Sequence, residues 1–225
     1  MTKLHPLALI FLLLISCQET EEPRLSDIPE NGIEIGDQIW MKKNLGIKKF
    51  RNGDDLFHAT NQADWEKAYL EKVPAWSYYE NLEENGNVYG LIYNYYAIVD
   101  GRELAPDDWK IPSISDWNTL FNFHGGILEA GKKLKSTEYW INRPGSNTNG
   151  FNALPGGERY IGGYFGSKGV IASFWTSTTE NSGDIITVGI SDLSEDSKIF
   201  VSTSNAAYFS PSQELPGYYL RCIKD

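Results

Sequence analysis

The hydrophobic pattern of the chain alternates in some stretches and follows a helical period in others. Residues 33–40 alternate around a Gly-Asp turn, which predicts a β-hairpin. Between residues 60 and 72, apolar side chains recur three and four positions apart. This spacing predicts an amphipathic helix, with Thr60 or Asn61 available as its N-cap.

A second helix has a clearer start signal. Ser113 is followed three residues later by Asp116, an arrangement that approximates a capping box. The apolar face that follows consists of Trp117, Leu120 and Phe121. Glycines at 125–126 end this helix, and residues 128–135 predict a short third one.

The other segments favour turns and strands. A polar turn is expected at residues 83–87, and the aromatic run 88–99 is interpreted as a buried strand. Apolar residues alternate again at 186–190, 199–203 and 218–222. Two or three short helices together with many short strands predict an α+β domain with an antiparallel sheet.

The N-terminal residues have a different character. Lys3 and the apolar run that follows it resemble a signal peptide covering residues 1–16, since the run is too short to span a membrane. The run ends in Leu-Ile-Ser before Cys17, which resembles the lipobox of bacterial lipoproteins. We therefore expect Cys17 to carry the lipid that attaches the protein to a membrane. An uncleaved anchor or an ordinary secretory signal is the alternative.

The segment 17–31 is polar and acidic, and we expect it to be a flexible tether. Its acidic residues resemble an export signal of Bacteroidetes lipoproteins, which implies an outer-membrane protein exposed at the cell surface. A solvated linker explains the same residues. Residues 32–225 are then expected to form one domain.

Charge and cysteine content narrow the possible functions. The formal net charge is −10, and removal of residues 1–16, which contain one Lys, leaves 19 basic and 30 acidic residues. Such a chain lacks the basic character of a nucleic-acid-binding protein. Cys222 is the one cysteine beyond Cys17, so an internal disulfide in the mature domain is not expected. The 7 Trp, 13 Tyr and 10 Phe predict a core rich in aromatic packing.

Six ordered blocks of sequence resemble one known family, the Fibrobacter succinogenes major paralogous domain. The blocks are GDQIWMKKNL at 36–45, YGLIYNYYA at 89–97, LAPDDWKIPS at 104–113, NGFNALPGG at 149–157, FWTST at 174–178 and GYYLRCIKD at 217–225. The resemblance implies a C-type-lectin-like fold on a secreted or surface protein. Many members have a cysteine where this chain has Ala105, and its implied partner corresponds to Cys222. The family's usual Gly-Trp-His and a Trp of the tyrosine-rich block are also replaced, the latter by Tyr95.

The search for catalytic or metal-binding patterns gives little. His58 and His124 belong to no cluster with metal-ligand spacing, and a capping or turn role is expected for His124. Cys222 is expected to be a buried, inert thiol. The sequence contains no nucleophile elbow and no phosphate-binding loop. No cofactor is expected. Segments 52–55 and 192–196 offer oxygen ligands that could bind calcium, but solvated acidic loops are the preferred interpretation of both.

Two functional hypotheses remain. The first is a non-catalytic, lipid-anchored binding module that recognises a glycan or a protein, and the second is an envelope assembly component that makes protein–protein contacts. An enzyme similar to the formylglycine-generating enzymes ranks last, because their cysteine chemistry does not suit a buried Cys222. The candidate ligand-binding residues are Trp140, Asn149, Glu158, Arg159 and Trp175. The alternative for the tryptophans is a place in the core.

Overall fold

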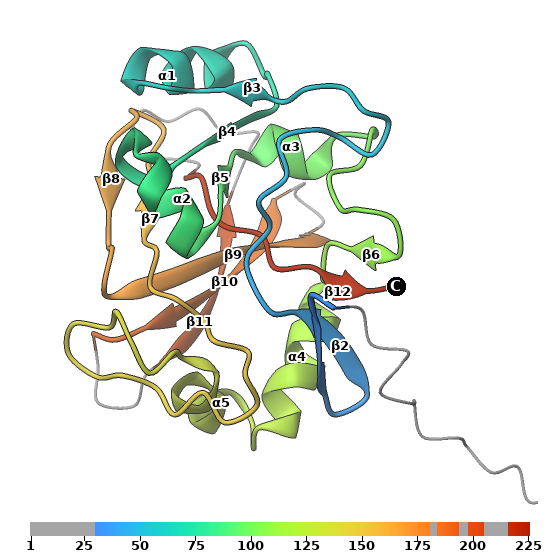
Figure 1. The fold of residues 1–225 in the computed structure, drawn as a ribbon, viewed down its shortest axis with the longest axis vertical. Coiled ribbons are helices and arrows are strands. Elements are labelled where there is room, and N and C mark those ends of the chain that lie inside the picture. The colour runs from blue at the N-terminus through green and yellow to red at the C-terminus, as the bar shows by residue number, and fades with distance from the viewer. Residues whose placement is uncertain (1–29, 181–183, 194–197, 205–215) are drawn as a thin grey trace, which may run out of the picture.

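The computed structural model describes residues 30–180, 184–193, 198–204 and 216–225. The expected signal peptide, Cys17 and nearly all of the expected tether lie outside these residues. Among the described residues, none of the helices combines the length and the apolar character that a membrane span requires. The described chain is an α+β structure with several separate sheets (Figure 1).

The three helices expected from local sequence signals are present. Helix α1 (Gln62–Leu70) is capped by Asn61, whose side chain accepts a hydrogen bond from the Asp64 backbone N–H. Helix α4 (Ile114–Phe123) begins with a complete capping box between Ser113 and Asp116. Helix α5 (Ile127–Leu134) follows directly. All three predictions are confirmed, and for α1 and α4 the signal is a capping side chain within one turn of the helix start.

The prediction of a turn followed by one long strand at residues 83–99 is wrong. Instead, a short 3₁₀ turn, η2, comes first, and helix, strand and helix follow. Their bounds are η2 (Tyr79–Asn81), α2 (Glu83–Tyr89), β5 (Ile92–Tyr93) and α3 (Tyr95–Val99). Gly90 ends α2 at a φ of 86°, and the Asn94 side chain caps α3 by accepting from the Ala97 N–H. Aromatic residues are tolerated in short buried helices, so local breakers and caps outweigh their strand preference.

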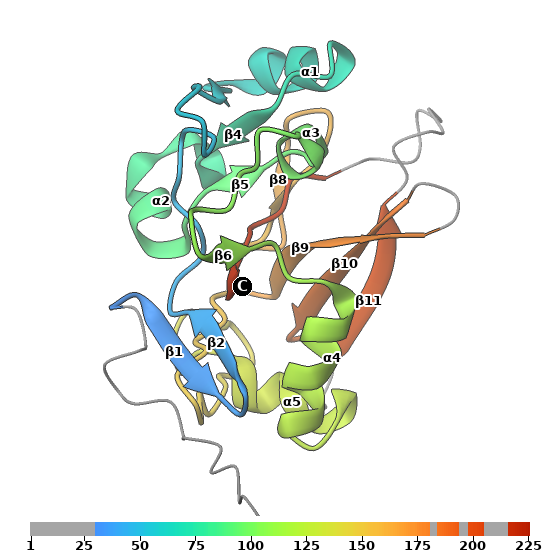
Figure 2. The same ribbon diagram turned by 90° about the vertical axis from the view of Figure 1, so that its right-hand side faces the viewer.

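Two sheets form the largest β-structures. One has the order β1-β2-β12-β6 and joins both ends of the described chain, and the other has the order β11-β10-β9. All their pairings are antiparallel. Their bounds are β1 (Gly32–Ile35), β2 (Gln38–Met41), β6 (Trp109–Lys110), β9 (Ile171–Thr179), β10 (Ile185–Ser191), β11 (Ile199–Ser204) and β12 (Ile223–Lys224). Helices α4 and α5 pack beside the β9–β11 sheet (Figure 2).

One of the two smaller sheets departs from the expected antiparallel architecture. Strands β7 (Glu158–Arg159) and β8 (Phe165–Gly166) form an antiparallel hairpin. Strands β3 (Phe57–His58) and β4 (Ala75–Ser77) pair in parallel, with α1 between them in sequence, and β4 then pairs with β5 in the antiparallel sense. The sheets are therefore antiparallel apart from this one pair.

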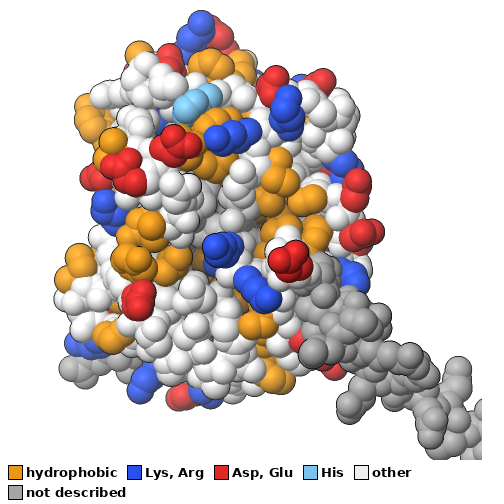
Figure 3. All heavy atoms as spheres, viewed as in Figure 1, with side chains coloured by type: hydrophobic (Ala, Val, Ile, Leu, Met, Phe, Trp, Pro, Cys, Tyr) orange, Lys and Arg blue, Asp and Glu red, His pale blue; other side chains and the backbone are white. Residues whose placement is uncertain are grey.

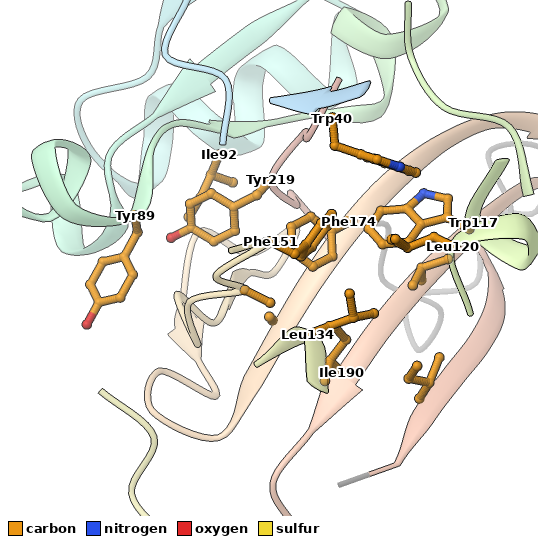
Figure 4. Packing of buried hydrophobic residues seen from close by; sticks show 14 of the residues in the cluster. Trp40, Tyr89, Ile92, Trp117, Leu120, Leu134, Phe151, Phe174, Ile190 and Tyr219 are labelled. Carbon is orange, nitrogen blue, oxygen red and sulfur yellow. The ribbon is translucent and has the colours of Figure 1, made fainter. Parts of the chain in front are cut away.

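Aromatic rings from distant segments fill the centre of the protein. Trp40, Trp117, Phe151 and Phe174 contact one another at centroid distances of 4.9–6.3 Å, as Figure 4 shows. Their side chains are fully buried. A second cluster contains Trp109, Trp175, Leu220 and Cys222. The core role predicted for the tryptophans is confirmed.

The C-terminal segment, residues 216–225, contacts several separate parts of the fold. Tyr218 bridges to β5 and Tyr219 bridges to β9, while the N–H groups of Met41 and Leu45 donate to carbonyl groups of Cys222 and Leu220 at 2.9 and 2.7 Å. The alternation at 218–222 thus corresponds to extended chain with single bridges, and the regular strand β12 begins at Ile223. This path carries Arg221 into the interior beside residues 41–45.

Candidate functional site

The two tryptophans proposed as ligand contacts lie inside the protein. Trp175 is fully buried, and its Nε1 donates to the carbonyl of Tyr93 at 2.9 Å. Trp140 is 6% exposed, and its Nε1 donates to the carbonyl of Ala153 at 3.2 Å. Both indole N–H groups already have intramolecular acceptors, so these residues stabilise the fold.

Of the other three candidates, one is engaged in bonds within the protein and two are partly buried. Arg159 is fully buried, and its terminal nitrogens donate to the Ala59 and Asn61 carbonyls and to the side chain of Asn81. Glu158 is partly buried in β7, and Asn149 is partly buried in the loop before Phe151. None of the five candidates lines the cleft described below, and their ligand-binding role stays a prediction.

The expectation of a solvated loop at 192–196 is wrong for Asp192, because its carboxylate is fully buried. It lies 3.1 Å from the ammonium of Lys135, which is equally buried. Burial raises the pKa of Asp192, but the backbone N–H groups of Asn142 and Arg143 and the Lys135 ammonium outweigh this effect, so the pKa is lowered overall. Residues 194–196 lie outside the described part of the chain. Within that part, no three His, Cys, Asp or Glu side chains are grouped to hold a metal ion.

The histidine and cysteine expectations can be compared with their positions. His124 occupies the C-cap position of α4, as expected, where its backbone N–H donates to carbonyl groups of the last turn, and its side chain is buried. Cys222 is fully buried, and burial raises the pKa of its thiol to about 12. The predicted burial of the thiol is thus confirmed, and its raised pKa keeps it protonated at neutral pH, which is consistent with the expected low reactivity.

A polar cleft lies between the Lys42–Lys48 segment, helix α2 and the loop that follows α5. Its volume is about 590 Å³, within the range of ligand pockets of roughly 300–1,000 Å³. Four basic side chains line it: Lys42, Lys43, Lys48 and Arg221. Two carboxylates, from Glu83 and Glu138, also line it. Basic side chains gather at the centre of the face in Figure 3.

Arg221 joins three segments at this cleft. Its Nε donates to the Asn44 side-chain oxygen at 2.9 Å. Its Nη1 donates to the carbonyl groups of Met41, Lys42 and Phe151 at 3.1, 3.3 and 2.6 Å. The side chain is 1% exposed. These bonds fix the guanidinium plane, as a preorganised binding group requires.

The charge of Arg221 has no carboxylate partner among the described residues. Burial lowers the pKa of Arg221 to about 9, so the guanidinium is still protonated at neutral pH. The adjacent Cys222 thiol is neutral there and supplies no negative charge. The residues that line the cleft therefore include a buried positive charge whose partners are neutral carbonyl and amide oxygens and the Phe151 ring, 4.7 Å from the guanidinium carbon.

Two lysines stand at the edge of the cleft. The Lys42 Nζ donates to the Glu30 carbonyl at 3.0 Å. The exposed Lys43 ammonium forms no hydrogen bond or ion pair with the described residues. With four cations and two carboxylates, the cleft lining has a surplus of two positive charges, although the whole chain is acidic. This local surplus favours an anionic ligand.

Two aromatic residues, Tyr78 and Tyr139, line the cleft. The Tyr78 hydroxyl accepts a hydrogen bond from the Lys48 Nζ at 2.9 Å, and the Tyr78 ring contacts Trp76 and the exposed His58, which stack at a centroid distance of 3.8 Å. Burial and the nearby Lys48 lower the pKa of His58. At the other end, Tyr139 is 53% exposed and has a φ of 69°.

Sequence reasoning missed this cleft. The Lys42-Lys43 pair and Arg221 were noted only as parts of family blocks at opposite ends of the chain. The one signal that could have indicated the site is a lysine pair followed by Asn44 in a chain with a strong acidic excess.

Fold and cleft together define an α+β domain with a positively charged cleft. A family model described as the Fibrobacter succinogenes major domain matches residues 33–224. The chain therefore belongs to this family, as the ordered sequence blocks predicted. No curated protein and no solved structure gives a significant match.

Proposed function

We propose that this protein is a non-catalytic binding module of the bacterial cell envelope that recognises a glycan through the cleft at Arg221. In this proposal, the lipid on Cys17 anchors it to the outer membrane and the acidic tether exposes the domain at the cell surface. The domain has the C-type-lectin-like form implied by its family resemblance, and the α+β architecture is compatible with that form.

The cleft is the observation that carries the proposal. Tyr139 offers an exposed ring face against which a sugar ring can pack. Asn87 is exposed, and its side-chain amide has no hydrogen-bond partner among the described residues, so it is available to sugar hydroxyl groups. Arg221 is held by bonds to two segments, residues 41–44 and Phe151, which positions one polar group before a ligand arrives.

The binding function can be tested with a glycan array that includes neutral and acidic saccharides. We expect binding to a limited set of glycans, and we expect Tyr139→Ala to weaken it without changing the melting temperature, because the ring is exposed. Tyr164→Ala is the matched control, since Tyr164 is 65% exposed and does not line the cleft. Absence of binding to every glycan, together with crosslinks to other envelope proteins on intact cells, would favour the assembly role.

The anchor is tested separately. Replacement of Cys17 by Ser should move the protein from the membrane fraction to the soluble fraction and abolish labelling with a fatty-acid analogue. Retention of the label in this variant would contradict lipidation at Cys17.

A further inference from the structure

The described residues include three cations whose side chains are fully buried, and each is stabilised in a different way. Lys135 pairs with the carboxylate of Asp192. Arg159 lies between the rings of Trp65 and Phe165, and both of its terminal nitrogens have oxygen acceptors. Arg159 has no carboxylate ion pair, and its unsatisfied nitrogen is the enclosed Nε. Arg221 also lacks a carboxylate partner and lies 4.7 Å from the Phe151 ring centroid, but the nitrogen that it leaves without an acceptor is the terminal Nη2. A buried charged donor without an acceptor is costly, so the unsatisfied Nη2 needs an explanation.

The unused donor of Arg221 lies in the lining of the cleft. Nε and Nη1 account for all of its hydrogen bonds, and Nη2 has no acceptor among the described residues. Unlike Nε of Arg159, which has no partner and is fully enclosed, Nη2 of Arg221 is not fully enclosed. Arg221 is among the residues that line the cleft. Because Nη2 has no acceptor and is not fully enclosed, an anionic oxygen of a ligand in the cleft could accept its hydrogen bond.

The surroundings of Arg221 favour the same type of ligand. Lys42 and Lys43 line the same cleft, and the Lys43 ammonium has no partner among the described residues. Glu83, one of the two cleft carboxylates, is already engaged as an acceptor of the Tyr78 hydroxyl at 3.4 Å. A ligand with one negative group would reduce the surplus positive charge and supply the missing acceptor.

We propose that the ligand of this cleft is an acidic saccharide whose carboxylate or sulfate group binds Arg221 and Lys43. This inference rests on the proposed glycan-binding function and adds the charge of the ligand. The exposed ring of Tyr139 and the amide of Asn87 contact the uncharged part of the sugar. A carboxylate and a sulfate both present the coplanar pair of oxygens that a guanidinium recognises.

The first test compares ligands that differ only in charge. Binding of an oligogalacturonate and of its methyl ester to the purified protein is measured by isothermal titration calorimetry, with a sulfated oligosaccharide and its desulfated form as a second pair. We expect the charged member of at least one pair to bind about tenfold or more tightly, with an affinity that falls as the salt concentration rises. The pair that responds identifies the anionic group.

The second test locates the anion. Lys42→Gln/Lys43→Gln should weaken binding of the charged ligand about tenfold and leave binding of the neutral partner unchanged. Lys67→Gln, on the exposed face of α1 and outside the cleft, is the matched control. Arg221→Met should abolish the preference for charge. The Arg221→Met variant loses its bonds to residues 41–44 and to Phe151 and can fail to fold. In that event, the lysine variant decides the question.

The outcomes separate this inference from the proposed function. Equal binding of the charged and neutral members of both pairs would overturn the acidic ligand and leave the glycan function intact. An unchanged affinity in the lysine variant would place the anion elsewhere and also overturn the inference. If inorganic sulfate shifts the amide signals around the cleft in NMR spectra but no saccharide binds, the glycan function and the acidic saccharide both fail.

Discussion

The buried pair of Lys135 and Asp192 provides the sharpest prediction about stability. Its side chains are fully buried, with Nζ and Oδ1 3.1 Å apart. The other carboxylate oxygen of Asp192 accepts the backbone N–H groups of Asn142 and Arg143 at 2.8 and 3.1 Å. The Lys135 ammonium also lies 4.2 Å from the ring centroid of Trp140. The pair thus attaches the end of α5 and the following loop to the end of β10.

Removal of one partner leaves the other charge buried. Asp192→Ala should therefore lower the free energy of unfolding by about 3–5 kcal/mol, and Lys135→Met should have an effect of similar size. The double variant Lys135→Met/Asp192→Asn removes both charges and keeps an oxygen that can accept the two backbone N–H groups. We expect it to lose less stability than either single variant, because neither charge is left without compensation.

Urea unfolding followed by tryptophan fluorescence measures these differences. The exposed pair of Lys49 and Asp55 is the control, since its N···O distance is 2.7 Å but its side chains are 59% and 78% exposed. Asp55→Ala should change stability by less than about 1 kcal/mol. A loss in Asp192→Ala no larger than in Asp55→Ala, or a double variant as unstable as the sum of the single variants, would refute the reasoning.

Three further predictions concern other parts of the core. Gly217→Ala should destabilise the protein by about 1–3 kcal/mol in the same unfolding assay, because the added Cβ would lie 2.4 Å from a buried tryptophan ring. Gly101→Ala is the control, since its added Cβ would have no atom within 4 Å. Burial lowers the pKa of His124 below 6.5, so the unfolded chain binds this proton more readily than the folded chain. The free energy of unfolding should therefore fall as the pH drops below 6.5, and His124→Leu should flatten that part of a pH–stability profile. Ala105→Cys places a second thiol in the buried cluster that contains Cys222. Oxidation should remove both free thiols and raise the free energy of unfolding by about 2–4 kcal/mol, which unfolding with and without reductant measures.

Local signals account for the part of the fold that could be predicted from the sequence. The capping box at Ser113 and the N-cap at Asn61 act within one helical turn, so the sequence around them is sufficient to place α4 and α1. The opening hairpin is equally local, with β1 and β2 joined at Gly36. The segment 83–99 was assigned wrongly because its aromatic residues suit a buried strand and a buried helix alike. There the choice depends on tertiary contacts, such as the Asn94 amide that also accepts from the backbone of β4.

The cleft could not be predicted because its central residue depends on contacts that span the chain. Arg221 lies 177 residues from Asn44 and 70 from Phe151, the positions whose oxygens accept its Nε and Nη1 hydrogen bonds. In the sequence it occurs among aromatic and apolar residues, where a buried strand was the natural interpretation. Trp140, Arg159 and Trp175 are predicted ligand contacts by residue type, yet all three are buried in the core. Residue type alone does not distinguish a buried arginine whose terminal nitrogens are all engaged, as in Arg159, from one with a nitrogen left for a ligand. That distinction depends on which oxygens the fold brings within hydrogen-bond distance, and at Arg221 they leave Nη2 without an acceptor among the described residues.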